Sequence, residues 1–195
     1  MDYLTLDDVT FIKLLGKGGY GEASLYSLNS DPKKQIVIKS INKDRDCAHM
    51  IDREVVAGQQ LSHKNICKYF ARFEDADQDY LAFEFIEGSF VKKILNLIHA
   101  GTDLFKYYRE RNFVPFTDKE AHYIFRQIAK AVMNCHDNNV AHLDIKLDNI
   151  MIDPKTHKAK LIDFGLCNFI TESNQGYFDY RVGSSEYWPG TLYFQ

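Results

Sequence analysis

The chain has 195 residues, of which 45% are hydrophobic and 26% charged, proportions typical of an ordinary soluble globular protein. Its 24 basic and 27 acidic residues give a formal net charge of −3, and the two signs are interspersed rather than grouped. This pattern argues against a nucleic-acid-binding stripe, and no apolar run reaches the roughly 18 residues that a membrane span needs. We therefore expect neither a nucleic-acid partner nor a membrane anchor.

The four cysteines are scattered, with no C-x-x-C pair. Such spacing is typical of reduced thiols rather than of a disulfide scaffold or a zinc site. The first residues, MDYLTLDDVT, lack the basic-then-apolar pattern of a secretion signal. We therefore expect a cytoplasmic protein, with the nucleus as the alternative location.

The first 88 residues have the pattern of a strand-rich unit. Alternating or β-branched runs bounded by turn-forming residues predict five strands, at 9–15, 22–28, 34–41, 68–75 and 80–88. Between the third and fourth runs, residues 47–61 change to a helical period. The apolar residues that share one face of this predicted helix are Met50, Ile51, Val55 and Leu61.

The second half of the chain is more helical, and its clearest element is a predicted helix that ends at Asp137. Thr117 and Glu120 form a capping box, in which each side chain accepts a hydrogen bond from a free backbone N–H of the first turn. Apolar side chains behind the cap recur at i, i+3 and i+4 and are expected to face the core. They are Ala121, Ile124, Phe125, Ile128, Val132 and Cys135.

A glycine cluster, LGKGGYGEA, begins at Leu15 and places Gly16, Gly18 and Gly21 in G-x-G-x-x-G spacing between two predicted strands. Such a turn can bring backbone N–H groups close over phosphates, with no side chain in the way. A dinucleotide fold would need a helix after the glycines, so the strand-to-strand context argues against one. On its own, the motif also fits a glycine-rich hairpin that binds nothing.

Charged and polar residues follow in a definite order. Lys39 ends the strand-like run IVIK, and Glu54 lies on the predicted helix that follows, where its carboxylate can pair with Lys39. HLDIKLDNIMID then places Asp144, Lys146 and Asn149 just before an apolar run. Taken singly, each has an ordinary explanation, such as a solvated lysine or an exposed helix acid.

The last of these motifs is LIDFGL, residues 161–166, which puts Asp163 at the end of a short strand. Taken in order, the motifs resemble the signature set of the eukaryotic-type protein kinase family, in identity and in spacing. The match runs from about Val9 to at least Tyr187. It implies an α+β, protein-kinase-like domain over residues 9–195, with a β-rich N-lobe (9–88) and an incomplete, mainly helical C-lobe (89–195) that ends in the activation segment.

The resemblance implies ATP- and Mg²⁺-dependent phosphoryl transfer to serine or threonine hydroxyls of a protein substrate. Asp144 would orient the substrate hydroxyl and accept its proton. Lys146 would reach the γ-phosphate, and a lysine here resembles the serine/threonine branch of the family. Asn149 and Asp163 would hold two Mg²⁺ ions through oxygen atoms.

The resemblance also implies how the nucleotide is held. Lys39 would clamp the α- and β-phosphates, with Glu54 fixing it, and the glycine cluster would cover the phosphates. The backbone of residues 84–86 would face adenine, behind a bulky Phe83. The complete set of expected nucleotide-binding residues is Leu15, Gly16, Gly18, Gly21, Ala23, Lys39, Glu54, Phe83, Glu84 and Ile86.

Three features depart from the family pattern. Leu143 stands where most kinases have arginine, so the usual pairing with a phosphorylated activation loop lacks its cation. Residues 89–100 look like an insertion and predict an amphipathic helix, which we expect to pack on the surface rather than to act as a docking motif. Its apolar stripe is Val91, Ile94, Leu95 and Ile98.

The third departure is the end of the chain. GSSEYWPG follows the family's G-T-x-x-Y-x-A-P-E as far as Tyr187, and the alternative alignment puts the G-T stretch at GTLYFQ, residues 190–195. In both, the helices that normally follow are absent, so we expect a fragment or a truncated product. A partner would then cover apolar groups left exposed beside the catalytic loop, namely Ile145, Leu147 and Ile150.

These departures leave two functions open. The chain is either a protein serine/threonine kinase or a non-catalytic, pseudokinase-like nucleotide-binding module that acts as a scaffold or competitor. The presence of all six charged and amide residues of the motifs favours the kinase.

Overall fold

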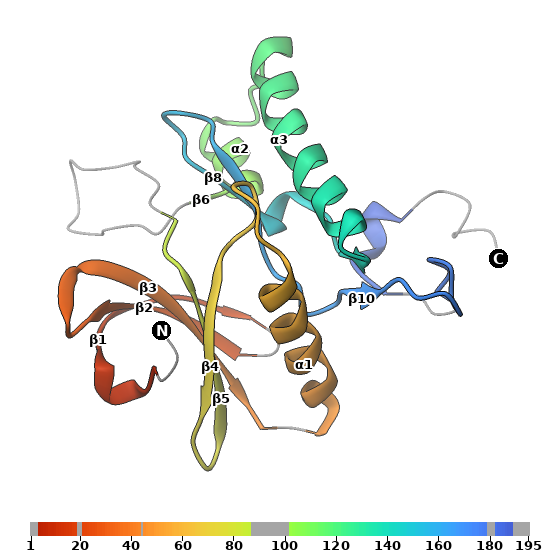
Figure 1. The fold of residues 1–195 in the computed structure, drawn as a ribbon. Helices are drawn as coiled ribbons and strands as arrows, with labels where there is room; N and C mark the ends of the chain where they lie inside the picture. The colour runs from red at the N-terminus through yellow and green to blue at the C-terminus, as the bar shows by residue number, and fades with distance from the viewer. Residues whose placement is uncertain (1–3, 19–20, 44, 87–101, 179–181, 189–195) are drawn as a thin grey trace.

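The computed structural model describes residues 4–18, 21–43, 45–86, 102–178 and 182–188. An antiparallel sheet and one helix form the N-terminal part, and two helices with several short strands form the C-terminal part (Figure 1). This arrangement confirms the expected α+β, kinase-like fold. The predicted helix at 89–100 and the GTLYFQ end lie outside the described residues.

Five strands form the N-terminal sheet, in the order β1-β2-β3-β5-β4. Their bounds are β1 Val9–Gly18, β2 Gly21–Leu28, β3 Asp31–Asn42, β4 Tyr69–Glu74 and β5 Gln78–Glu84. All five predicted strands are confirmed, with bounds that differ by a few residues. Strand β3 lies in the middle of the sheet, so it can hold a side chain in a fixed direction from both sides.

Helix α1 (Arg45–Gln60) packs against β4 and confirms the predicted change of period. Ile51 is buried in a small core with Ile41 and Leu81, and Val55 packs against its edge. Leu61, just after the helix, is buried in the larger core of the C-terminal part. The helix therefore contacts the cores of both parts of the molecule.

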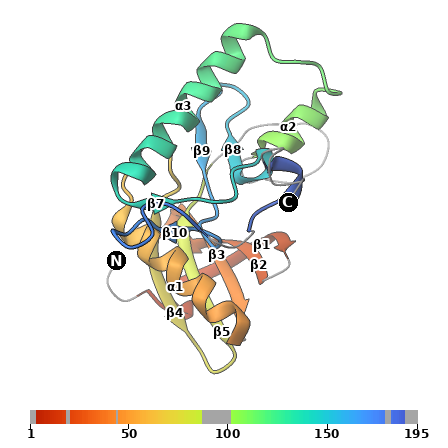
Figure 2. The ribbon, with the colours of Figure 1, turned by 90° about the vertical axis from the view of Figure 1, so that its right-hand side faces the viewer.

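Short strands and two helices make up the C-terminal part (Figure 2). The helices are α2 (Leu104–Glu110) and α3 (Asp118–Asp137). One small sheet has the order β6-β8-β9, and the other pairs β7 with β10. The bounds of these strands are β6 Thr102–Asp103, β7 Val140–Ala141, β8 Ile150–Ile152, β9 Ala159–Leu161 and β10 Asn168–Phe169.

Helix α3 packs against β7 and β9, and its buried face is narrower than predicted. Ile124, Ile128 and Cys135 are buried as expected, together with Ala131. The prediction was wrong for Ala121, which is exposed, and for Phe125, which is 74% exposed. Phe125 lies about 100° around the helix from Ile124, which turns its ring away from the strands that α3 covers.

The apolar groups beside the catalytic loop are also less exposed than predicted. Ile150 begins β8 and is only 6% exposed, and Leu147 packs against the C-terminal core. Ile145, at 40% exposed, is the one of the three that fits the expectation. Strand pairing of β8 with β9 explains the difference, because it draws Ile150 under α3.

Three residues between α1 and β4 join the two parts of the molecule. The Leu161 N–H donates to the Asn65 carbonyl at 2.8 Å, and the Cys67 N–H donates to the Leu161 carbonyl at 2.9 Å. Ile66 forms a parallel bridge with Leu161. This pairing fixes the end of β9, two residues before Asp163, beside the end of α1.

No helix among the described residues is long and apolar enough to cross a bilayer.

The predicted capping box is present, and it generates a test of stability. The Thr117 hydroxyl accepts a hydrogen bond from the Glu120 N–H at 3.3 Å, and the Thr117 N–H donates to Glu120 at 2.8 Å. We expect Thr117→Ala to lower the free energy of unfolding by about 0.5–2 kcal/mol, because two backbone N–H groups lose or weaken a partner. Chemical denaturation measures this change.

Lys119→Ala is the matched control, since Lys119 is exposed in the same turn of α3. We expect it to change the free energy of unfolding by less than about 0.5 kcal/mol. Equal losses in the two variants would show that the cap does not hold the helix.

Candidate active site

Strand β3 directs Lys39 toward α1. Ile36 and Ile38 are buried on one face of the strand, and the alternation of a strand places Lys39 on the other. The Lys39 ammonium lies 2.8 Å from Glu54 Oε2 and 3.1 Å from Asp163 Oδ1. The structure therefore brings together three of the predicted residues from β3, α1 and the loop after β9.

This ion cluster shifts the pKa of each member. Burial alone would lower the pKa of Lys39, but the charges of Glu54 and Asp163 outweigh it and raise that pKa. Burial raises the pKa of Glu54, whose side chain is only 4% exposed, despite the nearby ammonium. Desolvation would also raise the pKa of Asp163, but the charge of Lys39 lowers it. The cation is what keeps the two carboxylates close together.

The glycine cluster forms the β1–β2 hairpin, with Gly16 opposite Ala23 and Gly18 opposite Gly21. A Cβ atom on Gly21 would lie 2.0 Å from the carbonyl oxygen of Ser40, so the packing of β2 on β3 requires glycine there. A Cβ atom on Gly16 would meet nothing within 4 Å. Packing therefore does not explain Gly16, and the open space above it suits a ligand.

The loop after β7 holds the predicted catalytic residues, and the buried side chain of His142 links this loop to the segment after β9. His142 is buried, its Nε2 donates to the Ile162 carbonyl at 3.0 Å, and its Nδ1 accepts from the Asp144 N–H at 3.2 Å. Its ring packs edge-on against Phe164, with ring centroids 4.7 Å apart. Burial lowers the pKa of His142, which keeps the ring neutral in this role.

Asp144 is 6% exposed, and its two oxygens accept four hydrogen bonds. Oδ1 accepts from the N–H and the hydroxyl of Ser184, both at 2.9 Å. Oδ2 accepts from the Asn149 amide at 2.9 Å and forms an ion pair with Lys146 at 2.9 Å. Burial would raise the pKa of Asp144, but the hydrogen bonds from Lys146 and Ser184 lower it. The carboxylate is therefore held charged and in one orientation.

Sequence reasoning placed Asp144, Lys146 and Asn149 together, and it missed Ser184. The Ser184 hydroxyl also accepts a hydrogen bond from Lys146 at 2.8 Å, so it touches both predicted catalytic residues from 38 or more positions away. The available signal was GSS, which stands at the family's G-T position. His142 was likewise quoted within its motif but given no role.

Two left-handed backbone positions shape the same loop. Leu143 has a φ of 63° and Gly183 a φ of 86°. A Cβ atom on Gly183 would lie 2.4 Å from the Leu143 carbonyl oxygen. The close approach of these two backbones is what lets Ser184 reach Asp144.

Asn149 and Asp163, the predicted metal ligands, are held next to each other. The Ile162 N–H donates to the Asn149 carbonyl at 3.0 Å, and Asp163 follows directly. Because the Asn149 amide nitrogen donates to Asp144, its Oδ1 is the atom left to face a cation. Amide and carboxylate oxygens are hard ligands of the kind Mg²⁺ prefers, so this donor set fits the expected ion.

The predicted adenine-facing residues lie at the end of β5. Phe83 is half-buried and packs edge-on against Tyr69, with ring centroids 5.8 Å apart. The Glu84 side chain accepts a hydrogen bond from the Lys68 N–H at 2.7 Å and forms an ion pair with Lys160. The Glu84 N–H also donates to the Lys68 carbonyl at 2.9 Å, and the Glu84 carbonyl accepts from the Cys67 thiol at 3.9 Å, so its backbone groups already have partners within the protein. Leu15, Ala23 and Ile86 are half-buried.

Comparison with known proteins identifies the family of the chain. Residues 9–192 match the family model described as a protein kinase domain. The human NUAK family SNF1-like kinase 2 is 34% identical to the chain over 163 residues, or 81% of the chain. The carbon catabolite-derepressing protein kinase of Saccharomyces cerevisiae is 29% identical over 167 residues, or 84% of the chain. NUAK family SNF1-like kinase 1 of Mus musculus is 33% identical over 159 residues, or 79% of the chain.

The chain spans only part of these curated relatives. The matched region covers 23% of the human protein, 24% of the yeast protein and 21% of the mouse protein.

The ion cluster predicts a pH-dependent loss of stability on removal of its cation. We expect Lys39→Met to lower the free energy of unfolding by about 3–5 kcal/mol near neutral pH, because Glu54 is left buried and unpaired. Glu54 can relieve this by binding a proton, since its pKa is already raised in the folded state. A buried acid with a raised pKa loses stability as pH rises, so the deficit should grow between about pH 5 and pH 8. Thermal unfolding across this range measures it.

The double variant Lys39→Met/Glu54→Gln is the control, since it removes both charges. Its deficit should be smaller and nearly independent of pH. A deficit of Lys39→Met that is constant with pH would contradict the assignment of the effect to Glu54.

The contact between Gly183 and Leu143 generates a second test. We expect Gly183→Ala to destabilise the protein by clearly more than the roughly 1–2 kcal/mol that a left-handed alanine costs, since the new Cβ must also displace a backbone carbonyl. Gly176→Ala provides the matched control. Gly176 has a similar φ of 82°, but its Cβ would meet nothing closer than Ile170 at 4.0 Å. Denaturant titration of both variants gives the comparison, and equal losses would refute the close-approach argument.

Proposed function

Because the chain belongs to the protein kinase family, we propose that it carries ATP- and Mg²⁺-dependent phosphoryl transfer to serine or threonine hydroxyls of a protein substrate. The observation that carries the proposal is the cluster around Asp144. The Lys146 ammonium and the Asn149 amide both lie within hydrogen-bond distance of the charged Asp144 carboxylate, an arrangement that suits phosphoryl transfer to a hydroxyl.

On the nucleotide side, the Lys39 ammonium would bind the α- and β-phosphates, and Glu54 would hold it in place. Gly16 would let the β1–β2 hairpin approach the phosphates, since the space above it is open. Asn149 and Asp163 would hold Mg²⁺ through their oxygen atoms. When bound, Mg²⁺ supplies positive charge that offsets the charge of the phosphate oxygens.

On the substrate side, Asp144 would orient the hydroxyl and take its proton. The hydroxyl oxygen forms a bond to the γ-phosphorus, the bond from that phosphorus to the β–γ bridging oxygen breaks, and ADP leaves. The proton passes from the hydroxyl to the Asp144 carboxylate. A lysine at position 146 supports serine or threonine as the acceptor, by resemblance to that branch of the family.

The hydrogen bonds of Asp144 suggest how substrate and nucleotide act together. A carboxylate has about four acceptor sites, and the partners of Asp144 described above fill four. A substrate hydroxyl therefore needs one donor to leave. Lys146 is the partner with reason to move, since the γ-phosphate would attract its ammonium. Nucleotide binding would thus free Oδ2 of Asp144 for the hydroxyl.

Two substitutions separate the proposed roles. We expect Asp144→Asn to lower the rate of transfer by about a hundredfold or more while sparing nucleotide affinity, because Asp144 acts on the substrate hydroxyl. Asp163→Ala should weaken Mg²⁺-dependent nucleotide binding itself. Radiolabelled phosphate transfer and calorimetric titration of nucleotide measure the two effects, in this chain and in a longer protein that contains it.

The same experiment distinguishes the two predicted functions. Nucleotide binding without transfer that depends on Asp144, in the longer protein as well, would favour the non-catalytic module. If both substitutions lowered nucleotide affinity equally, the proposed division between Asp144 and Asp163 would be wrong.

A further inference from the structure

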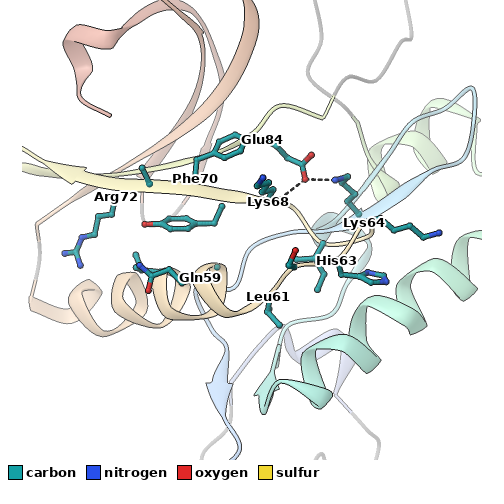
Figure 3. Close-up of a pocket in the computed structure, with 15 residues that line it drawn as sticks. Gln59, Leu61, His63, Lys64, Lys68, Phe70, Arg72 and Glu84 are labelled. Carbon is teal, nitrogen blue, oxygen red and sulfur yellow. Dashed lines mark hydrogen bonds and ion pairs between the residues drawn. The ribbon is translucent and has the colours of Figure 1, made fainter. Parts of the chain in front are cut away.

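A groove lies between the end of α1 and the start of β4 (Figure 3), and neither Lys39 nor Asp144 lines it. Its volume is about 930 Å³. A second hollow of about 550 Å³ lies against α3 and β9. Lys64 and Lys160 line both hollows, which therefore adjoin, and we call the two together the basic groove.

Positive charge is concentrated in the basic groove. Four lysine or arginine side chains line the first hollow and five line the second, and two of these are shared. Glu84 is the one carboxylate among the lining residues. Seven cations beside one acid stand out in a chain whose net charge is −3.

Most of these cations are free to meet a ligand. Arg72 is engaged by Asp79 at 2.7 Å and by Asp52 at 2.9 Å, and Lys160 is engaged by Glu84. Within the described ranges, the other five have no carboxylate at ion-pairing distance. They are Lys64, Lys68, Arg126, Lys130 and Lys158.

His63 lies in the same groove and responds to this charge. Its Nδ1 accepts a hydrogen bond from the Asn65 N–H at 3.1 Å. Burial first, and then the charges of Lys64, Lys130 and Lys160, lower the pKa of His63. These three lysines therefore produce a positive field at one place in the groove.

The groove also has an apolar lining. Val55, Leu61 and Ile66 lie along the side formed by α1 and the following loop, and Tyr69 and Phe70 lie on β4. The Lys68 ammonium lies 5.7 Å from the centroid of the Phe70 ring. Apolar side chains and cations thus line the same hollow, which suits a ligand that carries both apolar groups and negative charges.

We propose that the basic groove binds a short acidic segment of a partner protein, in which carboxylate side chains alternate with apolar ones. The cations would pair with the carboxylates, and the apolar lining would take the intervening side chains. None of the seven cations belongs to the residues proposed for phosphoryl transfer; Glu84 is the one lining residue that also belongs to the expected nucleotide site.

Two other occupants fit less well. A long nucleic acid that extended beyond Arg72 would approach the exposed carboxylates of Glu74, at the end of β4, and of Asp75 and Asp77, in the β4–β5 turn, which would repel its phosphates. Residues 89–100 of the chain itself contain Lys92 and Lys93 and no carboxylate, so the groove would repel them too.

Charge reversal tests the proposal with a fluorescent peptide of alternating glutamate and leucine. We expect Lys64→Glu/Lys130→Glu to weaken binding of this peptide about tenfold or more, since two exposed attractive pairs become repulsive. Lys33→Glu/Lys34→Glu is the matched control, because both side chains are exposed on β3 and the change of net charge is the same. It should weaken binding less than about twofold.

The assay uses anisotropy without nucleotide, so a failure of phosphoryl transfer would not affect it. Circular dichroism confirms that each variant is folded, and hydrogen exchange with the peptide bound should show protection at 59–72 and 123–130. Equal weakening in the two double variants, or no binding of the peptide by the parent chain, would overturn the proposal. Tighter binding of a single-stranded RNA than of the peptide would also overturn it, in favour of nucleic acid.

Discussion

The ammonium of Lys39, held between Glu54 and Asp163, is the interaction on which the arrangement of the molecule depends. Its three members come from the central strand of the sheet, from α1 and from the loop after β9. The buried carboxylate of Glu54 and the half-exposed carboxylate of Asp163 would repel one another if the cation were absent. The position of α1 against the sheet, and of β9 beneath both, is therefore linked to a single side chain.

The cluster around Asp144 has the opposite arrangement of charge, with a carboxylate at its centre rather than a cation. Here a carboxylate, Asp144, is central, and Lys146, Asn149 and Ser184 supply its donors. The His142 ring accepts a hydrogen bond from the Asp144 N–H and donates one to the Ile162 carbonyl, so it joins the two backbones. Both clusters therefore meet at the segment that contains Asp163, so neither can move far without the other.

Local patterns predicted the strands, α1 and the capping box of α3, because each depends on neighbours in sequence. Gly21 was predicted to approach phosphates, yet the structure shows that it is needed for packing against Ser40, which lies on another strand. Phe125 was predicted to be buried, and its exposure depends on which strands α3 meets rather than on its own period. Ser184 could not be assigned for the same reason, since its partners come from a loop 38 or more positions earlier. Sequence reasoning thus failed at Gly21, Phe125 and Ser184, where tertiary packing decides.

The contact between Lys39 and Asp163 also sets an order of events during synthesis, because the two residues are separated by 124 positions. The antiparallel pairs β1–β2 and β2–β3 join strands that follow one another directly, so this part of the sheet has low contact order and can form early. Domains generally begin to fold from the N-terminus as the chain emerges. During synthesis, the early strands and helix α1 can therefore form with Glu54 already beside Lys39. Asp163, the second carboxylate of the cluster, joins them only after it has left the ribosome.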